Sequence, residues 1–136
     1  MEHPLILPML IQMSLALVIL FIMAPRRITA VKKAGGPAAI RKAGGFSTSL
    51  VNMGDNFKNQ FEIPVIFYAV CILFIVAGTT TTAVVAAAWV FVVFRILHTL
   101  VQCTNNKIFP NRFSVFLIST LALVFMVVAA LLQAIA

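Results

Sequence analysis

Two short clusters of polar side chains interrupt long apolar runs, and they are the residues of this sequence best suited to chemistry. The first cluster, at offsets 0, 3, 4 and 7, consists of Asp55, Lys58, Asn59 and Glu62. The second, at offsets 0, 3 and 7, consists of Arg95, His98 and Gln102. At about 100° per residue, each set falls on one face of a helix. We therefore expect two polar helix faces that lie at similar depth and face each other.

The side chains in and around these clusters suit a small charged ligand. The cations available are Arg26, Arg27, Lys58, Arg95 and Arg112. Guanidinium groups bind carboxylates through paired hydrogen bonds, and a glutamate can hold an amine, so the mixture favours a zwitterionic peptide with several carboxylates. The alternative is a polar clasp, in which a buried Glu62–Arg95 ion pair fixes helix packing without doing chemistry. His98 taken alone also fits a packing role.

The histidines and cysteines are not spaced as metal ligands. They are His3, His98, Cys71 and Cys103. None of these residues forms a close pair along the chain, whereas zinc and redox motifs need such spacing. We expect no metal site, and we interpret both cysteines as small packing residues.

The composition requires lipid as part of the solvent. Of the 136 residues, 62% are hydrophobic and 10% are charged, whereas soluble domains have about 45–50% apolar and about 25% charged residues. This argues against a soluble enzyme, a disordered chain and a disulfide scaffold. The sequence indicates an integral membrane protein with one domain over residues 1–136.

Four apolar runs are long enough to cross a bilayer, which takes about 20 residues for a core about 30 Å thick. We predict helices over residues 5–24, 55–77, 83–103 and 112–136. The runs are continuous rather than alternating, so they predict helices and not a barrel. The expected fold is an all-α bundle of four transmembrane helices.

The positions of the basic residues predict the orientation of the chain. Seven of the ten Lys and Arg residues lie at positions 26–58, before the second apolar run itself begins at Phe61, and short basic loops stay in the cytoplasm. A basic cytoplasmic loop is therefore expected over residues 25–54, with the uncharged turn at 78–82 and both termini outside. This arrangement explains the net charge of +7 without a nucleic-acid partner.

The basic loop contains a short repeat, Lys-Ala-Gly-Gly at residues 33–36 and again at 42–45. Glycine disfavours a stable helix throughout this segment. One interpretation is a flexible loop that lies on anionic lipid headgroups. The other is that part of it covers a ligand.

Three segments resemble the MAPEG family, the membrane-associated proteins in eicosanoid and glutathione metabolism. The likeness is to a bacterial-type member of that family. Residues 59–64, Asn-Gln-Phe-Glu-Ile-Pro, resemble the family's Asn-x-x-Glu element followed by a proline. Residues 95–99, Arg-Ile-Leu-His-Thr, resemble the Arg-x-x-His-Thr stretch of the branch with microsomal prostaglandin E synthase, and residues 110–112, Pro-Asn-Arg, resemble its Pro-x-Arg. The order and spacing of these segments extend the likeness over nearly the whole chain.

The resemblance implies a homotrimer that binds glutathione as co-substrate between subunits near the cytoplasmic surface. It implies that Asn59, Glu62 and His98 contact glutathione. Arg112 would stabilise its thiolate, and Arg26 or Arg27 would reach one of its carboxylates. The implied cofactor-binding residues also include Lys58, Arg95 and Gln102, and Arg95 would support the site through Glu62. The implied activity is that of a transferase or peroxidase acting on a hydrophobic electrophile from the bilayer, in a bacterial inner membrane.

Two positions depart from the family pattern. Asp55 stands where several family enzymes have an arginine, and Gln102 stands where a tyrosine is usual. Lys58 keeps one cation near the first position. The alternatives are a non-catalytic member of the fold that binds lipid or acts as a scaffold, and a small transporter or channel. For Arg112, the alternative role is a snorkelling anchor at the membrane interface.

Overall fold

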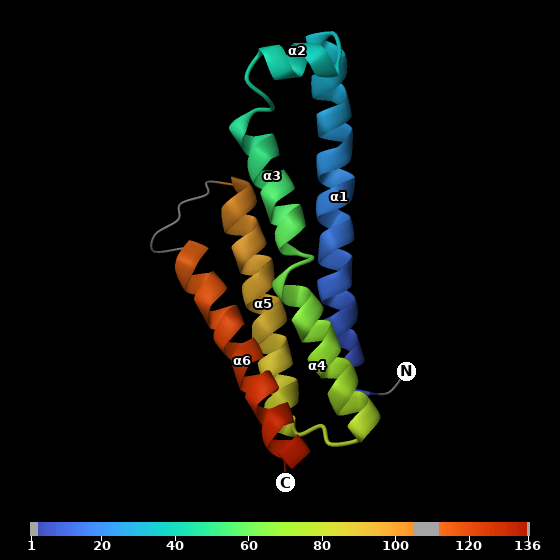
Figure 1. The fold of residues 1–136 in the computed structure, drawn as a ribbon, viewed down its shortest axis with the longest axis vertical. Helices are drawn as coiled ribbons and strands as arrows, with labels where there is room; N and C mark the ends of the chain where they lie inside the picture. The colour runs from blue at the N-terminus through green and yellow to red at the C-terminus, as the bar shows by residue number, and fades with distance from the viewer. Residues whose placement is uncertain (1–2, 105–111, 136) are drawn as a thin grey trace.

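The computed structural model describes residues 3–104 and 112–135 of the chain. Every element within these residues is a helix (Figure 1), in the order α1 (Ile6–Ala34), α2 (Pro37–Lys42), α3 (Thr48–Asn59), α4 (Ile63–Ala77), α5 (Thr82–Thr104) and α6 (Phe113–Ile135). Four segments are long and apolar enough to span a bilayer: α1, α3 with α4, α5 and α6. The predicted fold class, an all-α multi-pass membrane protein, is confirmed. Pro110 and Asn111, which entered the sequence predictions, lie outside the described residues.

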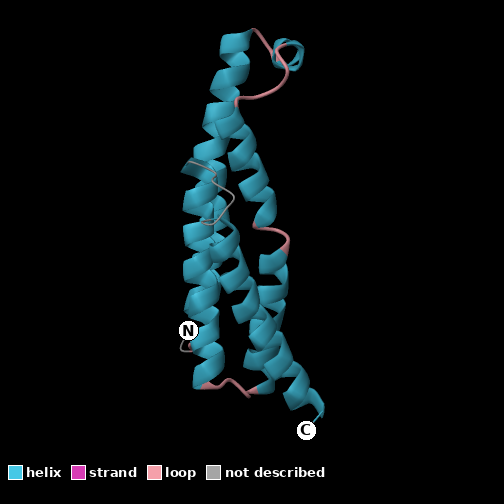
Figure 2. Cartoon of the chain, turned by 90° about the vertical axis from the view of Figure 1, so that its left-hand side faces the viewer, coloured by secondary structure: helices cyan, strands magenta, loops and turns pink. Residues whose placement is uncertain are grey.

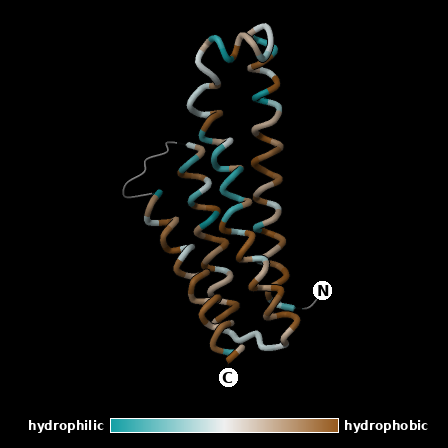
Figure 3. Tube along the Cα trace, in the orientation of Figure 1, coloured by the Kyte–Doolittle hydropathy of each residue, from teal (hydrophilic) through white to brown (hydrophobic). Residues whose placement is uncertain are grey.

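Helix α5 is the centre of the bundle. It contacts α1, α3 and α6, while α4 packs against α1 and α6. The two termini lie at the end of the bundle opposite α2 (Figure 1). Apolar residues dominate the terminal end, and polar residues gather around α2 and midway along α3 and α5 (Figure 3).

Helix α1 ends ten residues later than the sequence indicated. We expected it to end at residue 24, before Pro25, but it continues to Ala34. The proline removes one N–H from the helix ladder, and contacts with α3 accompany the continued helix. A helix of 29 residues is about 43 Å long, so its last turns extend beyond a hydrocarbon core of about 30 Å.

The two Lys-Ala-Gly-Gly repeats are two helix ends. At the first, Gly35 adopts φ 88° and the Gly36 N–H donates to the Val31 carbonyl at 2.9 Å. At the second, Gly44 adopts φ 87° and the Gly45 N–H donates to the Ile40 carbonyl at 2.9 Å. This left-handed cap favours glycine, which has no Cβ to clash. The expected loop over 25–54 is therefore wrong in extent, since it includes the end of α1, all of α2 and the beginning of α3.

The second transmembrane segment is broken in its middle. We expected one helix over 55–77, whereas α3 ends at Asn59 and α4 begins at Ile63 with Pro64 in its first turn. The break is visible as a loop partway along the bundle (Figure 2). Helix α4 has 15 residues and is about 22 Å long, which is too short to cross the core alone. The break therefore lies within the hydrocarbon region.

Backbone hydrogen bonds close part of this break. The last carbonyls of a helix have no partner within it, and in lipid each must find one elsewhere. The Gln60 N–H donates to the Phe57 carbonyl at 3.1 Å, and the Phe61 N–H donates to the Lys58 carbonyl at 2.8 Å. These two tight turns satisfy two of the four terminal carbonyls of α3.

Side chains satisfy the other two terminal carbonyls. Gln60 Nε2 donates to the Asn56 carbonyl at 3.2 Å. Arg95 Nη2, from α5, donates to the Asn59 carbonyl at 2.6 Å. All four terminal carbonyls of α3 are thus paired, which lowers the cost of ending this helix inside the membrane.

Packing divides the bundle interior into three layers. The apolar core at the terminal end includes the stacked rings of Phe67 and Phe91, 4.3 Å apart, and the buried Cys71. A smaller apolar cluster of Met23, Leu50 and Met53 lies toward α2. Between them is a layer of buried polar side chains: Gln12, Asn56, Gln60, Arg95, His98, Thr99 and Gln102.

Replacing Gln60 with leucine tests whether its side chain closes the break. We expect Gln60→Leu to lower the free energy of unfolding by about 1–3 kcal/mol, because the Asn56 carbonyl loses its partner in an apolar setting. Thermal unfolding in detergent measures the effect. The matched control is Gln133→Leu, which removes an exposed hydrogen bond to the Thr79 carbonyl and should change stability by less than about 0.5 kcal/mol. Equal effects would mean that Gln60 has no special role.

Candidate functional site

A network of buried amides joins three helices at the level of the break. Gln12 Nε2 of α1 donates to Gln60 Oε1 at 2.9 Å, and Gln60 Nε2 lies 3.3 Å from Thr99 Oγ1 of α5. Asn56 Nδ2 of α3 donates to Gln102 Oε1 of α5 at 2.9 Å. These side chains fix α1, α3 and α5 relative to one another.

Beside this network, a cavity of about 300 Å³ opens between the break, α5 and the beginning of α6. Its lining residues are Asn59, Glu62, His98, Arg112, Phe113 and Phe116. Asn59 is the last residue of α3, and Glu62 immediately precedes α4. The break thus turns both side chains toward α5 and α6. Four of the residues that the sequence singled out meet in this one cavity.

The cavity has an acceptor side and a cationic side. Asn59 and the exposed Glu62 contribute a side-chain amide and a carboxylate. Arg112 contributes the cation, and its Nε lies 3.5 Å from His98 Nε2, to which it donates a hydrogen bond. A zwitterionic ligand could be held between the two sides, with the Phe116 ring 5.7 Å from the His98 ring as one wall.

Arg95 and Gln102 lie behind the cavity. Their side chains are buried at 1% exposure each. We expected Arg95 to form a buried ion pair with Glu62, but its hydrogen bond goes to the Asn59 carbonyl. Gln102 accepts from Asn59 Nδ2 at 3.2 Å. The broken helix explains the difference, since it leaves a carbonyl that needs a donor and an exposed Glu62.

Asp55 and Lys58 do not reach the cavity. The two side chains form an exposed salt bridge of 3.7 Å with each other on the surface of α3. We expected one helix face to carry all four residues of the first polar cluster, but only Asp55, Lys58 and Asn59 lie on α3, and Glu62 follows its end. Of the three residues on α3, only Asn59 lines the cavity. An exposed pair of this kind contributes about 0–1 kcal/mol.

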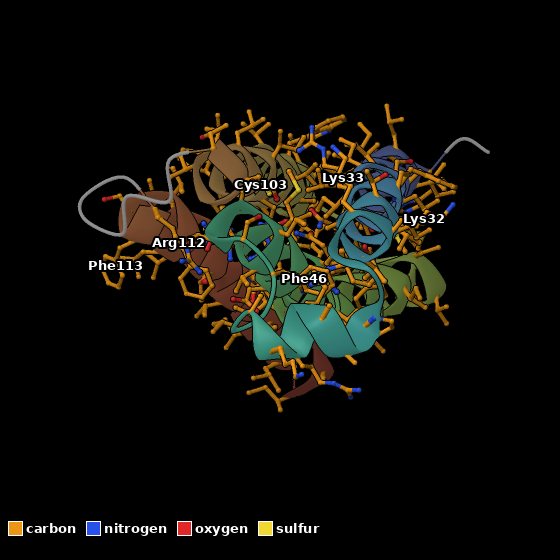
Figure 4. All side chains as sticks on the ribbon, turned by 90° about the horizontal axis from the view of Figure 1, so that it is seen from above. Lys32, Lys33, Phe46, Cys103, Arg112 and Phe113 are labelled. Atoms are coloured by element: carbon orange, nitrogen blue, oxygen red, sulfur yellow. The ribbon has the colours of Figure 1, made fainter. Side chains whose placement is uncertain are left out.

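Arg26 and Arg27 lie on α1, away from the cavity. Arg27 packs against α3, where it donates to the Leu50 carbonyl at 3.5 Å and lies over the Phe46 ring at 5.1 Å. Gly54 makes this packing possible, since a Cβ there would overlap the Arg27 guanidinium. Arg26 is exposed and lines a shallow hollow of about 360 Å³ with Lys33. Viewed from the α2 end, Arg112 lies on the opposite side of the bundle from Lys32 and Lys33 (Figure 4).

The sequence reading did not assign roles to several residues that build the site. Asn56, Gln60 and Thr99 support it, and Phe113 and Phe116 line it. Asn56 and Gln60 are four residues apart, a spacing that lets their side chains meet on one helix face. From the sequence we selected the charged residues beside them, Asp55 and Lys58, instead. Gln12 was visible as a polar residue in an apolar run, but its partner 48 positions away was not.

The described residues contain no group of three or more His, Cys, Asp or Glu side chains that could hold a metal ion. The polar groups that line the cavity are the Arg112 guanidinium, the Glu62 carboxylate, the Asn59 amide and the His98 imidazole. They suit binding of a zwitterion and stabilisation of an anion beside a guanidinium group.

Comparison with known proteins gives one finding. The family model described as the MAPEG family matches residues 5–132. Neither the search of curated proteins nor the search of solved structures gave a match.

Arg95 and Lys58 allow a matched test of which cation supports the site. We expect Arg95→Met to lower the free energy of unfolding by about 1–3 kcal/mol, because the Asn59 carbonyl loses its donor within the membrane. Lys58→Met removes only an exposed salt bridge and should cost less than about 1 kcal/mol. Thermal unfolding of both variants in the same detergent measures the difference. Equal stability of the two variants would contradict the role given to Arg95.

Proposed function

The chain belongs to the MAPEG family, and from this we propose that it is a glutathione-dependent membrane transferase or peroxidase acting on a hydrophobic electrophile. The observation that carries the proposal is the cavity in which Arg112 lies opposite Asn59 and Glu62. The family's members generally use glutathione. Four of the residues that the family resemblance assigns to glutathione line this cavity: Asn59, Glu62, His98 and Arg112.

The groups around the cavity match those of glutathione. Glu62 and Asn59 suit the amine of the tripeptide, since a carboxylate and an amide oxygen accept from an ammonium group. Arg112 suits an anionic group. Small-molecule sites are usually about 300–1,000 Å³, so a cavity of about 300 Å³ is at the small end and leaves room for a neighbouring subunit to complete it.

Bound glutathione would supply a thiolate nucleophile. A free thiol has a pKa of about 8.5, and a nearby cation lowers that pKa toward neutrality. Arg112 is the cation available at this cavity, and its hydrogen bond to His98 holds the guanidinium in place. The apolar setting strengthens the stabilisation of the anion.

We further propose a homotrimer, with glutathione between subunits. Arg26 is the exposed member of the arginine pair and touches α3 only through a 3.7 Å contact of its Nη1 with Met53 Sδ, so it is the better placed of the two to face a neighbouring subunit, whereas Arg27 is packed against α3. Arg26 would reach a glutathione carboxylate. The proposed location is a bacterial inner membrane, with the α2 end in the cytoplasm and both termini outside, as the basic residues favour.

The departures from the family pattern bear on affinity. Asp55 replaces a family arginine, and Lys58 is paired with Asp55 at the surface rather than directed to the cavity. The cation expected from Lys58 is therefore not available inside one subunit. Arg26 and Arg112 are left to hold the carboxylates and the thiolate.

A second candidate function is non-catalytic lipid binding or scaffolding. It is favoured by an apolar groove of about 160 Å³ between α1, α3 and α5. Ile19, Ile96, Leu100 and Cys103 are among its lining residues. An acyl chain in this groove would need no thiolate, so the two functions differ in their dependence on Arg112.

Titration with glutathione separates these functions. We expect the parent protein in detergent to show the ultraviolet absorbance of a bound thiolate, and Arg112→Ala to lose it, because no other cation lies in the cavity of the described subunit. Lys58→Ala is the control and should keep the signal. Absence of the signal in the parent, together with absence of binding by calorimetry, would contradict the transferase proposal and favour lipid binding.

A further inference from the structure

The orientation of the Asn59 side chain determines what the cavity can recognise. An asparagine presents either a carbonyl acceptor or an NH₂ donor, depending on how its amide is turned. Asn59 lies at the boundary between the cavity and the buried network. Its partner on the buried side therefore decides which of the two groups faces the ligand.

That partner is Gln102. Gln102 Oε1 accepts from Asn59 Nδ2 at 3.2 Å and from Asn56 Nδ2 at 2.9 Å. Gln102 is buried at 1% exposure and does not line the cavity. The Asn59 backbone is held separately, since its carbonyl accepts from Arg95 Nη2 at 2.6 Å. Both the backbone and the amide of Asn59 are thus fixed from behind.

We propose that Gln102 is a positioning residue that turns the Asn59 amide so that its oxygen, Oδ1, faces the cavity. With Nδ2 held by Gln102, Oδ1 is the group left for a ligand. Oδ1 and the Glu62 carboxylate then form a site made only of acceptors, which selects a ligand amine. This inference rests on the proposed binding of glutathione, and it reassigns Gln102 from a ligand contact to a residue that acts through Asn59.

A double-mutant cycle on glutathione affinity tests the proposal. The variants are Asn59→Ala, Gln102→Leu and the double variant, with affinity measured by calorimetry in detergent. We expect Asn59→Ala to weaken binding by about tenfold or more, since it removes a hydrogen bond to a charged group. Gln102→Leu should weaken it by about fivefold to tenfold, and the double variant no more than Asn59→Ala alone. Losses that multiply would mean that the two residues act independently, and this would overturn the proposal.

Gln12→Leu is the matched control. Gln12 is also a fully buried glutamine of the network, but it bonds Gln60 and not Asn59. It should destabilise the protein to a similar degree as Gln102→Leu while leaving glutathione affinity within about twofold. An equal loss of affinity in both variants would show a general effect of the network and would overturn a specific role for Gln102.

Gln102→Glu provides a second variant in case Gln102→Leu does not fold. It keeps oxygen acceptors at the same position, so the Asn59 amide stays turned and most of the affinity should be retained. Loss of affinity as large as that expected for Gln102→Leu would overturn the proposal. If the parent does not bind glutathione, the proposed function fails. If the parent binds glutathione but Asn59→Ala binds it equally well, the role given to Gln102 and Asn59 is overturned while the proposed function stands, so the two failures are distinguishable.

Discussion

A helix that breaks inside a membrane must find partners for every carbonyl that it frees. Water is absent there, and each unpaired backbone group costs several kcal/mol. The break between α3 and α4 satisfies this constraint with two backbone N–H groups, Gln60 Nε2 and Arg95 Nη2. Much of the polar interior follows from this need. Gln12, Thr99 and Asn56 are buried because they complete the hydrogen bonding of Gln60.

The same break creates the candidate site. A continuous helix would not turn Asn59 and Glu62 toward α5 and α6 in this way, and the cavity would lose its acceptor side. Arg95 serves both purposes, since its bond to the Asn59 carbonyl closes the helix and fixes the cavity wall. Stability and ligand recognition therefore depend on one set of contacts. The cation, Arg112, comes from the other wall and is held by His98.

The sequence predicted the spans and most of the cavity, but not its geometry. Apolar runs of about 20 residues mark membrane helices directly, so four spans could be inferred. Polar residues within or beside such apolar runs are costly to bury and therefore indicate a binding or packing role. On this basis, Asn59, Glu62, His98 and Arg112 could be selected from the sequence. The hydrogen-bond partners of Arg95 and Gln102 could not be predicted, since they depend on a helix break that periodicity alone does not reveal. Pro64, in the first turn of α4, was the residue that could have indicated the break. Gly35 and Gly44 likewise lie at helix ends, although we interpreted the segment around them as a loop.

We propose that glutathione binds in the cavity formed at the break. An experimental structure of the protein in lipid with glutathione bound would test this directly. We expect the tripeptide within hydrogen-bonding distance of Asn59 and Glu62, with its sulfur beside Arg112. Glutathione bound elsewhere, for example at the exposed salt bridge of Asp55 and Lys58, or a continuous helix in place of the break, would contradict this proposal.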